Sequence, residues 1–288
     1  AALREVFGFT QGQYLTLRKE IAGQDLRRSY SICAGVDDGE LRVGVRKVKG
    51  GVFSNWINEQ LQPGDTIQVM APQGRFFVPI EPEAERHHVG MAGGSGITPV
   101  FSILRSVLAK AQGRITLLYA NRDEKSVIFR DELKALAAAH PTRLQVIHWL
   151  DSVQGVPSVA QLTELARGQV LAPAQAQAFI CGPGLFMDAA VAALQAPDAQ
   201  GNRVSGHGLV HGASNTFVHA PHRPVVALGT HDLLIVDTPD AVLVCAADAA
   251  QDVKQVVEVL GAEAAKTPRL IGLIAQYHEE GQILVFVE

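Results

Sequence analysis

The chain has few cysteines, no long apolar run and no excess of basic charge, and each scarcity excludes a class of protein. Its three cysteines, Cys33, Cys181 and Cys245, are far apart. They form neither a disulfide framework nor the closely spaced set of a plant-type iron–sulfur cluster. No run approaches the roughly 18 apolar residues of a membrane span, and no signal peptide is visible. The net charge of −4 offers no basic surface for nucleic acid. We therefore expect a cytoplasmic protein without membrane or nucleic-acid partners.

Residues 1–80 have the pattern of a small antiparallel β-barrel. The 288 residues, 47% of them hydrophobic, suffice for about two globular domains. Short β-prone runs at 13–17, 29–33, 41–45 and 66–70 are separated by glycine-rich turns, and one helical run covers 53–61. We expect Ser54 to cap that helix or to face a ligand at its start. Six or so short strands with one helix predict a barrel.

Beyond a polar linker at 81–87 the pattern changes to alternating strands and helices. Strands are expected at 88–92, 115–119, 144–148 and 178–181, and helices at 99–111, 128–139, 158–167 and 184–196. Such alternation predicts a parallel sheet with crossover helices, here a nucleotide-binding α/β domain over residues 85–196. Ligands of these sheets bind at the carboxyl ends of the strands, where residues 93–98 and 181–184 fall.

The glycine-rich stretch Met91-Ala92-Gly93-Gly94-Ser95-Gly96-Ile97-Thr98-Pro99 stands between the first of these strands and its helix. Glycines let the backbone approach a ligand closely, and the free N–H groups at a helix start favour a phosphate. A glycine loop alone is weak evidence for a phosphate site, since many such loops are plain turns. The motifs on either side of the loop decide whether it binds a phosphate.

Four sequence boxes occur in a fixed order along the chain. They are Arg28-Ser29-Tyr30-Ser31, Gly50-Gly51 before Phe53-Ser54, the glycine loop, and Cys181-Gly182-Pro183. By these boxes residues 1–196 resemble the ferredoxin–NADP reductase superfamily in its oxygenase-reductase branch, with the reductases of phenylacetyl-CoA epoxidase most similar. The resemblance implies an FAD-dependent oxidoreductase. It would pass a hydride from NADPH or NADH to FAD and electrons on to a separate acceptor, an oxygenase or a ferredoxin-type partner.

The resemblance also implies which residues hold FAD. Arg28 would clamp its pyrophosphate, Tyr30 would offer an aromatic face to the isoalloxazine ring, and Ser31 a hydroxyl to the reactive nitrogen. Val45 and Arg46 match the strand that lines the flavin. The loop and helix start that hold the FAD phosphates are matched by Gly51, Val52, Phe53 and Ser54.

For the nicotinamide nucleotide, the resemblance implies that Gly93, Gly94, Ser95, Gly96 and Thr98 carry the pyrophosphate, with Thr98 near the nicotinamide. Cys181, with Gly182 and Pro183, would lie close to the place of hydride transfer and position the reactants rather than act as a nucleophile. Arg122 and Ser126 match the arginine and serine that bind the 2′-phosphate of NADPH, which favours NADPH although Asp123 is adjacent. The expected catalytic group is Tyr30, Ser31 and Cys181.

The resemblance ends near residue 196 and departs from the family in two ways. The first barrel strand is expected to be missing, because Ala1 falls just before the segment that follows it. Neither the family's flavin-covering end nor a ferredoxin domain follows the last helix. The alternative to an enzyme is therefore a non-catalytic, reductase-like scaffold with impaired flavin binding.

Residues 197–288 read as an α+β extension of another origin. A loop at 197–202 and a histidine- and glycine-rich stretch to 222 precede expected strands at 225–228, 233–237, 241–245 and 282–287 and a helix at 252–260. Residues about 200–260, including Ala213-Ser214-Asn215 and Val236-Asp237-Thr238-Pro239-Asp240-Ala241, resemble the later part of mannose-1-phosphate guanylyltransferases. Residues 273–287 faintly resemble DEAD-box helicases.

These tail resemblances suggest a composite chain, or chimera, and carry over no activity. The catalytic glycine-rich loop of guanylyltransferases and the P-loop of helicases are both lacking. A sugar-nucleotide-binding remnant is a third alternative. The tail histidines are not expected to bind metal, because Gly206, Gly208 and Gly212 oppose a helix that would align His207 with His211.

Overall fold

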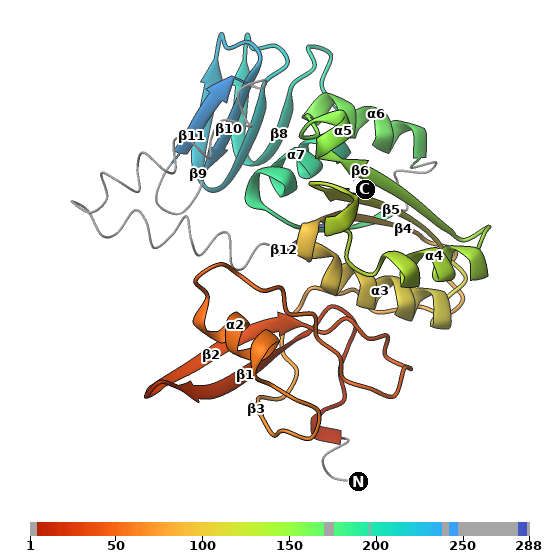
Figure 1. Cartoon of the computed structure of the whole chain (residues 1–288). Helices are drawn as coiled ribbons and strands as arrows, with labels where there is room; N and C mark the ends of the chain where they lie inside the picture. The colour runs from red at the N-terminus through yellow and green to blue at the C-terminus, as the bar shows by residue number, and fades with distance from the viewer. Residues whose placement is uncertain (1–4, 170–175, 196, 238–241, 247–281, 287–288) are drawn as a thin grey trace.

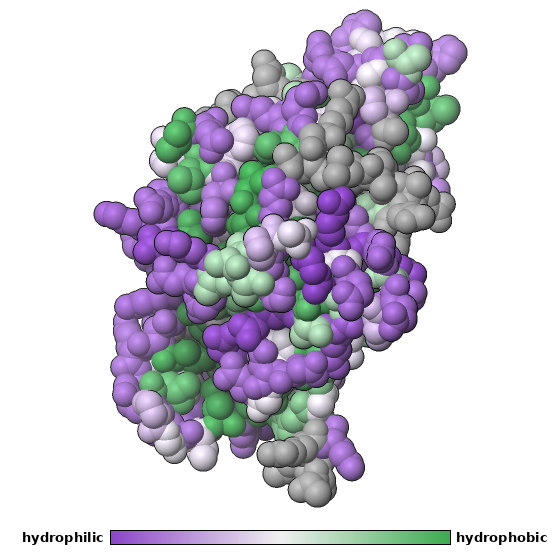
Figure 2. All heavy atoms as spheres, turned by 90° about the vertical axis from the view of Figure 1, so that its right-hand side faces the viewer, coloured by the Kyte–Doolittle hydropathy of each residue, from purple (hydrophilic) through white to green (hydrophobic). Residues whose placement is uncertain are grey.

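The computed structural model describes residues 5–169, 176–195, 197–237, 242–246 and 282–286, which form three packed parts. Figure 1 shows an antiparallel N-terminal part, a central α/β part whose helix α3 faces it, and an extension sheet on the other side of the central part. None of the described helices is long and apolar enough to cross a membrane. On the face seen in Figure 2, apolar side chains occur in separate groups among polar ones.

The N-terminal part contains an antiparallel sheet in the order β2-β1-β3. Its strands are β1 (Tyr14–Ile21), β2 (Gln24–Ser31) and β3 (Gln68–Val69), and helix α2 (Val52–Glu59) packs on them. The β1–β2 turn uses Ala22 and Gly23, both at positive φ, as tight hairpins require. Leu15, Leu17 and Phe53 are buried between sheet and helix. The predicted antiparallel architecture is confirmed.

One predicted strand in this part, at 41–45, is wrong. Only Val43 pairs with the sheet, through a single antiparallel bridge to Ile32. The next residue, Gly44, packs against the central part, where an added Cβ would lie 3.2 Å from Thr98 Cγ2. Residues 44–46 therefore follow the surface of the central part instead of continuing a strand.

The central part is a parallel sheet with helices on both faces, as predicted. The strand order is β12-β7-β4-β5-β6, with β12 antiparallel to β7 and the other pairs parallel. Its elements are β4 (His87–Gly93), η1 (Gly94–Gly96), α3 (Ile97–Lys110), β5 (Arg114–Asn121), η2 (Glu124–Ser126), α4 (Arg130–Ala139), β6 (Leu144–Leu150), α5 (Asp151–Gln154), α6 (Val159–Gln169), β7 (Ala176–Cys181), α7 (Gly184–Leu194) and β12 (Gln282–Phe286).

Helix α3 joins the N-terminal and central parts. Cys33, Phe76 and Val78 of the N-terminal part share a core with α3 side chains such as Phe101. The buried Ser102 hydroxyl donates to the Ala34 carbonyl at 2.7 Å. Because a shared apolar core and a buried hydrogen bond both cross the boundary, the two parts pack as one unit.

Arg143 closes the carboxyl end of α3. Its guanidinium donates to the carbonyl oxygens of Val107, Leu108, Ala111 and Gly113. These acceptors belong to the last turn of α3 and the loop behind it, where helices leave carbonyls unsatisfied. The substitution Arg143→Met is expected to lower the free energy of unfolding by about 2–4 kcal/mol, because several acceptors lose a charged donor. Urea denaturation measures the loss, with Arg114→Met at an exposed neighbouring position as the control; equal losses would contradict the prediction.

The extension is a four-stranded sheet in the order β11-β10-β9-β8. Its strands are β8 (Arg203–His211), β9 (Phe217–Leu228), β10 (Leu233–Asp237) and β11 (Val242–Ala246). Strands β8, β9 and β10 run parallel, so Arg203 pairs with Phe217 and Phe217 with Leu234, while β11 is antiparallel to β10. The chain thus coils, with successive strands stacked beside each other.

The histidine- and glycine-rich stretch up to residue 222, to which the sequence pattern assigned no element, contains β8 and half of β9. Its residues Gly206 and Gly208 are strand residues that lie close to β9. Gly206 has φ +72, lies at a register shift, and has the Ala220 carbonyl oxygen 2.4 Å from where a Cβ would be. Glycine in a strand often marks such a bulge rather than a loop. The helix predicted at 252–260 lies outside the described residues, and the last strand is observed as β12.

The extension packs on the central part through one apolar core. Phe217, Leu234 and Val236 share this core with Met187 and Val191 of α7. Since all five side chains are buried, the extension is held against α7 by the hydrophobic effect.

Asp188, on the same helix, makes stability depend on pH. It is 4% exposed, its Oδ1 has no hydrogen-bond partner among the described residues, and burial raises its pKa from 3.8 to about 7. The folded chain therefore keeps a proton that the unfolded chain releases, so this carboxyl lowers stability as pH rises from about 4 to about 7. The full penalty is on the order of 4 kcal/mol.

The substitution Asp188→Asn is expected to remove this penalty. The variant should exceed the parent chain in free energy of unfolding by about 2–4 kcal/mol at pH 8 and by much less at pH 4.5. Urea denaturation at both pH values measures the difference. A stability difference that is the same at both would show that Asp188 is ionised in the folded chain.

Candidate functional site

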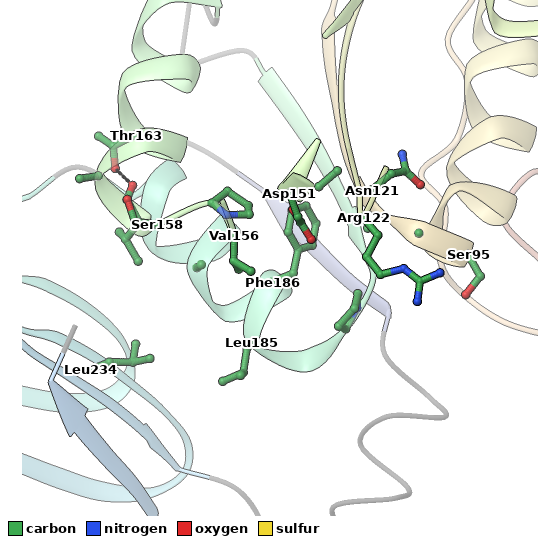
Figure 3. Close-up of a pocket in the computed structure, with 18 of the residues that line it drawn as sticks. Ser95, Asn121, Arg122, Asp151, Val156, Ser158, Thr163, Leu185, Phe186 and Leu234 are labelled. Carbon is green, nitrogen blue, oxygen red and sulfur yellow. Dashed lines mark hydrogen bonds between the residues drawn. The ribbon is translucent and has the colours of Figure 1, made fainter. Parts of the chain in front are cut away.

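A large pocket lies where the three parts meet. Its volume is about 1260 Å³, which exceeds the roughly 300–1,000 Å³ of most small-molecule sites. The walls come from residues 44–46 of the N-terminal part, the glycine loop and strand ends of the central part, the start of α7, and the extension. Figure 3 shows Ser95, Asn121 and Arg122 at one end and Ser158, Thr163 and Leu234 at the other.

The glycine loop is packed so tightly that side chains could not replace two of its glycines. A Cβ on Gly96 would lie 2.1 Å from the Cys181 carbonyl oxygen, and one on Gly93 would lie 2.8 Å from Pro183 Cδ. Gly94 instead has φ +52 and open space beside it, on the pocket side. The loop therefore rests flat on residues 181–183 and exposes its backbone to the pocket.

Tyr119 holds the loop from below and is a residue that sequence reasoning missed. Its hydroxyl donates to the Gly94 carbonyl at 3.0 Å and accepts from the Ile128 amide at 3.2 Å. The side chain is fully buried, and burial raises its pKa to about 12. Within the loop, the Thr98 hydroxyl donates to the Ser95 carbonyl at 3.0 Å. These bonds fix the loop before any ligand binds.

Cys181 and Gly182 lie behind the loop and do not line the pocket, whereas Pro183 does. The Cys181 side chain is 6% exposed, and burial raises its pKa to about 12. A thiol with this pKa stays protonated at neutral pH and is a poor nucleophile.

The strand ends add two polar side chains that sequence reasoning also missed. Asn121 ends β5 and is 4% exposed, and neither atom of its amide has a hydrogen-bond partner among the described residues. Asp151, directly after β6, has one buried carboxylate oxygen without a partner in the same part of the chain, and burial raises its pKa. Both line the pocket. Buried polar atoms without partners at a cavity wall suit a polar ligand. Both residues could have been found from the sequence, because ligands of parallel sheets bind at the carboxyl ends of the strands.

Arg122 and Ser126 line the pocket as well, but their surroundings differ. The Ser126 hydroxyl donates to the Asp123 carbonyl at 2.7 Å and accepts from the Asp123 amide at 3.1 Å. The Asp123 carboxylate accepts from the Ser126 amide at 2.9 Å, which turns it back into this loop. Figure 3 shows the Arg122 side chain extending toward the end of the pocket where Ser95 lies. The forked cation is therefore available to a ligand, while Ser126 is engaged.

Of the residues expected to hold a flavin, only Val45 and Arg46 line this pocket. Arg28 and Tyr30 lie on one face of β2, opposite Leu17 and Leu15 of β1, and Ser31 points to the other face. Tyr30 is half-buried, with its ring centroid 6.3 Å from that of Phe53, and burial raises its pKa. Arg28 is exposed, and its guanidinium donates to the Arg27 carbonyl.

The start of α2 fits a phosphate-bearing group, although Ser54 does not cap it as predicted. Gly51 is the N-cap residue, and no side chain caps the helix. The Ser54 hydroxyl accepts from the Val48 amide at 3.2 Å and donates to the Gly51 carbonyl at 3.4 Å. Val52 and Phe53 thus begin a helix whose first N–H groups have no side-chain acceptor, as an anion site requires.

A row of stacked side chains fixes the N-terminal part against the central part near the pocket. Arg42 lies over the Phe129 ring at 6.0 Å, Phe129 stacks on Phe101 at 4.6 Å, and Arg105 lies over Phe101 at 5.6 Å. Arg105 also pairs with Asp38 at 2.9 Å. Phe129 has φ +58, a strained value for a bulky residue. Such strain persists where the surrounding packing determines the conformation, here beside residues 44–46.

Within the described part of the chain, no group of three or more His, Cys, Asp or Glu side chains is arranged to hold a metal ion. Two of the tail histidine rings make other contacts: His231 shares a hydrogen bond with Ser214 at 2.7 Å, and His219 stacks on Phe217.

Comparison with known protein families assigns each part of the chain. Residues 2–78 match the oxidoreductase FAD-binding domain, and residues 91–192 match the oxidoreductase NAD-binding domain. Residues 210–260 match the MannoseP isomerase/GMP-like beta-helix domain, which agrees with the coiled parallel strands of the extension. The tail resemblance to mannose-1-phosphate guanylyltransferases is thereby confirmed.

Individual relatives give the same assignment. The chain is 45% identical to the ferredoxin reductase component of 3-ketosteroid-9-alpha-monooxygenase from Rhodococcus rhodochrous, over 65% of this chain and 52% of that protein. It is 37% identical to a subunit of 1,2-phenylacetyl-CoA epoxidase from Escherichia coli K12, over 67% and 57%. The FAD/NAD-binding domain of nitric oxide dioxygenase from Vibrio cholerae is 27% identical with a TM-score of 0.54, over 66% and 80%. The chain spans about half the length of the curated relatives it matches.

The matched FAD-binding and NAD-binding domains make residues 2–192 a two-domain oxidoreductase body whose cofactors are FAD and a nicotinamide nucleotide. Residues 2–192 are similar to the reductase components of oxygenase systems, and the two regions matched within them are FAD-binding and NAD-binding oxidoreductase domains. The extension carries a β-helix domain of another family on the same chain.

Proposed function

We propose that this chain is a flavin-dependent NAD(P)H reductase with domains at residues 1–80, 85–196 and 197–288. The observation that carries the proposal is the pocket that joins residues 44–46 of the FAD-binding domain to the glycine loop of the NAD-binding domain. Hydride transfer requires flavin and nicotinamide in contact, and this junction is where the two domains can present them to each other. FAD, when bound, supplies the chemistry that takes a hydride from NAD(P)H and releases electrons singly.

On the flavin side, the chain contributes binding and orientation. Arg28 pairs with the FAD pyrophosphate through its exposed, forked guanidinium. The uncapped N–H groups at the start of α2, from Val52 onward, donate to the FAD phosphates. Tyr30 supplies a half-buried aromatic face, and Ser31, on the opposite face of β2, a hydroxyl donor.

On the nucleotide side, the pre-ordered glycine loop binds the pyrophosphate. Gly94 and Ser95 face the pocket, and Thr98 lies in the first turn of α3, whose free N–H groups face the phosphate. Arg122 binds the 2′-phosphate of NADPH, which makes NADPH the preferred donor over NADH. Cys181 acts by packing behind the loop and keeping water out of the place of hydride transfer. Its buried thiol stays protonated, so it does not act as a nucleophile.

The electron acceptor is a separate protein of the oxygenase or ferredoxin type. The names of two relatives support this type of acceptor: one is a ferredoxin reductase component of a monooxygenase, and the other is a subunit of an epoxidase.

The test is the visible absorption spectrum of the purified chain before and after anaerobic addition of NADPH. A flavin spectrum that bleaches supports the reductase. A colourless protein that cannot be loaded with FAD overturns it and leaves the non-catalytic scaffold. Thermal stabilisation by GDP-mannose in place of NADPH would favour the sugar-nucleotide-binding remnant instead.

A further inference from the structure

The part of the pocket farthest from the flavin wall is formed partly by the extension. Asn215, Phe217, Leu233 and Leu234 of the extension line it, opposite Ala189 of α7. Figure 3 shows Leu234 on this side, across from Leu185 and Phe186. A domain from another family therefore contributes a wall to the nucleotide pocket.

The order of groups along the pocket decides which half of a dinucleotide reaches this wall. At one end, residues 44–46 of the flavin-binding domain fix the position of the nicotinamide, since it must meet the flavin. The glycine loop takes the pyrophosphate next, and Arg122, directly after β5, lies beside it at the end of the pocket away from Leu234 (Figure 3). The adenosine half then extends away from the flavin, toward the extension.

The chemistry of this compartment suits an adenine base. Its walls are mainly apolar, from Leu185, Phe186, Ala189, Leu233 and Leu234, and the flat faces of a purine are buried well by such side chains. The unpartnered polar atoms of Asn121 and Asp151 lie on the approach to it, where a ribose or a base edge offers hydrogen bonds.

We propose that the extension closes the adenosine end of the nicotinamide-nucleotide site, with Leu234 as the side chain from this domain that packs on the base. The inference rests on the proposed function for the direction of the dinucleotide. It gives the extension a task in specificity: recognition of the adenine half, separate from hydride transfer.

The structure offers a matched pair of variants to test this. Leu234 and Ile235 are neighbours on β10, 4% and 5% exposed. Leu234 faces α7 and the pocket, whereas Ile235 faces the separate core of Val218 and Ala227. Leu234→Ala and Ile235→Ala therefore both remove a buried side chain of the extension, and only the first changes the pocket wall.

The experiment is isothermal titration of the full chain with AMP and, separately, with nicotinamide mononucleotide. Leu234→Ala is expected to raise the Kd of AMP about three- to tenfold, since several buried methylenes leave the base, and to leave the Kd of nicotinamide mononucleotide unchanged. Ile235→Ala should change neither. Thermal melting identifies a variant that fails to fold, in which case Leu234→Met replaces it and should shift AMP binding in the same direction by a smaller factor.

An unchanged AMP affinity in a folded Leu234→Ala chain, or equal losses for both nucleotides or both variants, would overturn the inference. The bleaching of the parent chain by NADPH is read independently. If NADPH bleaches the parent chain and Leu234→Ala leaves the Kd of AMP unchanged, the proposed reductase function is supported and the proposed role of the extension is overturned. If NADPH never bleaches the chain while Leu234→Ala alone weakens AMP binding, the role of the extension is supported and the reductase function is overturned.

Discussion

Replacing Gly96 with alanine is expected to reduce the rate of flavin bleaching by NADPH at least about 100-fold. The new Cβ would lie 2.1 Å from the Cys181 carbonyl oxygen and 2.7 Å from the Gly182 amide nitrogen. Both neighbours are backbone atoms, so no side-chain rotation can relieve the overlap, and the loop must move off residues 181–183. A displacement of about 1 Å in a positioning loop can cost two orders of magnitude in rate.

Stopped-flow absorbance measures this rate, and the glycine loop supplies its own comparison. Gly94→Ala adds a Cβ on the pocket side that meets no protein atom within 4 Å, so it leaves the loop packed on residues 181–183. The strain of φ +52, about 1–2 kcal/mol, and crowding of the nucleotide should slow bleaching, but less than Gly96→Ala does. Reduction of the bound flavin by dithionite shows whether each variant still holds FAD. A Gly96→Ala chain that bleaches within twofold of the parent rate would mean that the loop does not carry the nucleotide.

The second large effect concerns the choice between NADPH and NADH. Arg122→Met is expected to raise the KM for NADPH about 10- to 100-fold and to leave the KM for NADH nearly unchanged. A charge-assisted hydrogen bond contributes about 1.5–3 kcal/mol, and only NADPH has the phosphate to accept it. Arg122 lines the pocket, and Asp123 beside it is bonded to the Ser126 amide, so the carboxylate does not compete for the guanidinium.

Steady-state reduction of a dye acceptor with each nucleotide gives both KM values. Arg130→Met is the control, because Arg130 is an exposed arginine nearby that pairs with Glu124 and does not line the pocket. The Ser126 hydroxyl is hydrogen-bonded to the backbone of Asp123. Ser126→Ala should therefore loosen this turn and change the KM values for NADPH and NADH by similar factors. A loss for Arg122→Met that is equal for NADPH and NADH would remove Arg122 from the 2′-phosphate site.

The two proposals depend on different parts of the chain. Gly96 and Arg122 test the reductase body, which relatives share, whereas Leu234 tests the extension, which has its match in a β-helix family. If the substitutions of Gly96, Arg122 and Leu234 all have their expected effects, the chain is a reductase in which a domain from another family forms part of the nucleotide site.

The sequence by itself determined the central α/β part and the chemistry of its loops. Alternating strands and helices predicted β4 to α7 within a few residues, because a parallel sheet demands buried apolar strands and crossover helices of minimum length. The order of four boxes, from Arg28 to Pro183, predicted the FAD- and NAD-binding domains that the family comparisons confirm.

Only the tertiary structure decided which residues of the three parts contact one another. Residues 41–45 have strand periodicity, yet Gly44 packs on Thr98 and the strand is lost to an interdomain contact. The glycines of β8 argued only against a helix, and the structure shows that they lie in a strand close to β9. Leu234 lines the nucleotide pocket because α7 and β10 pack together. Such contacts join residues far apart in the chain, and local sequence patterns carry no record of them because they encode only what happens within a few residues.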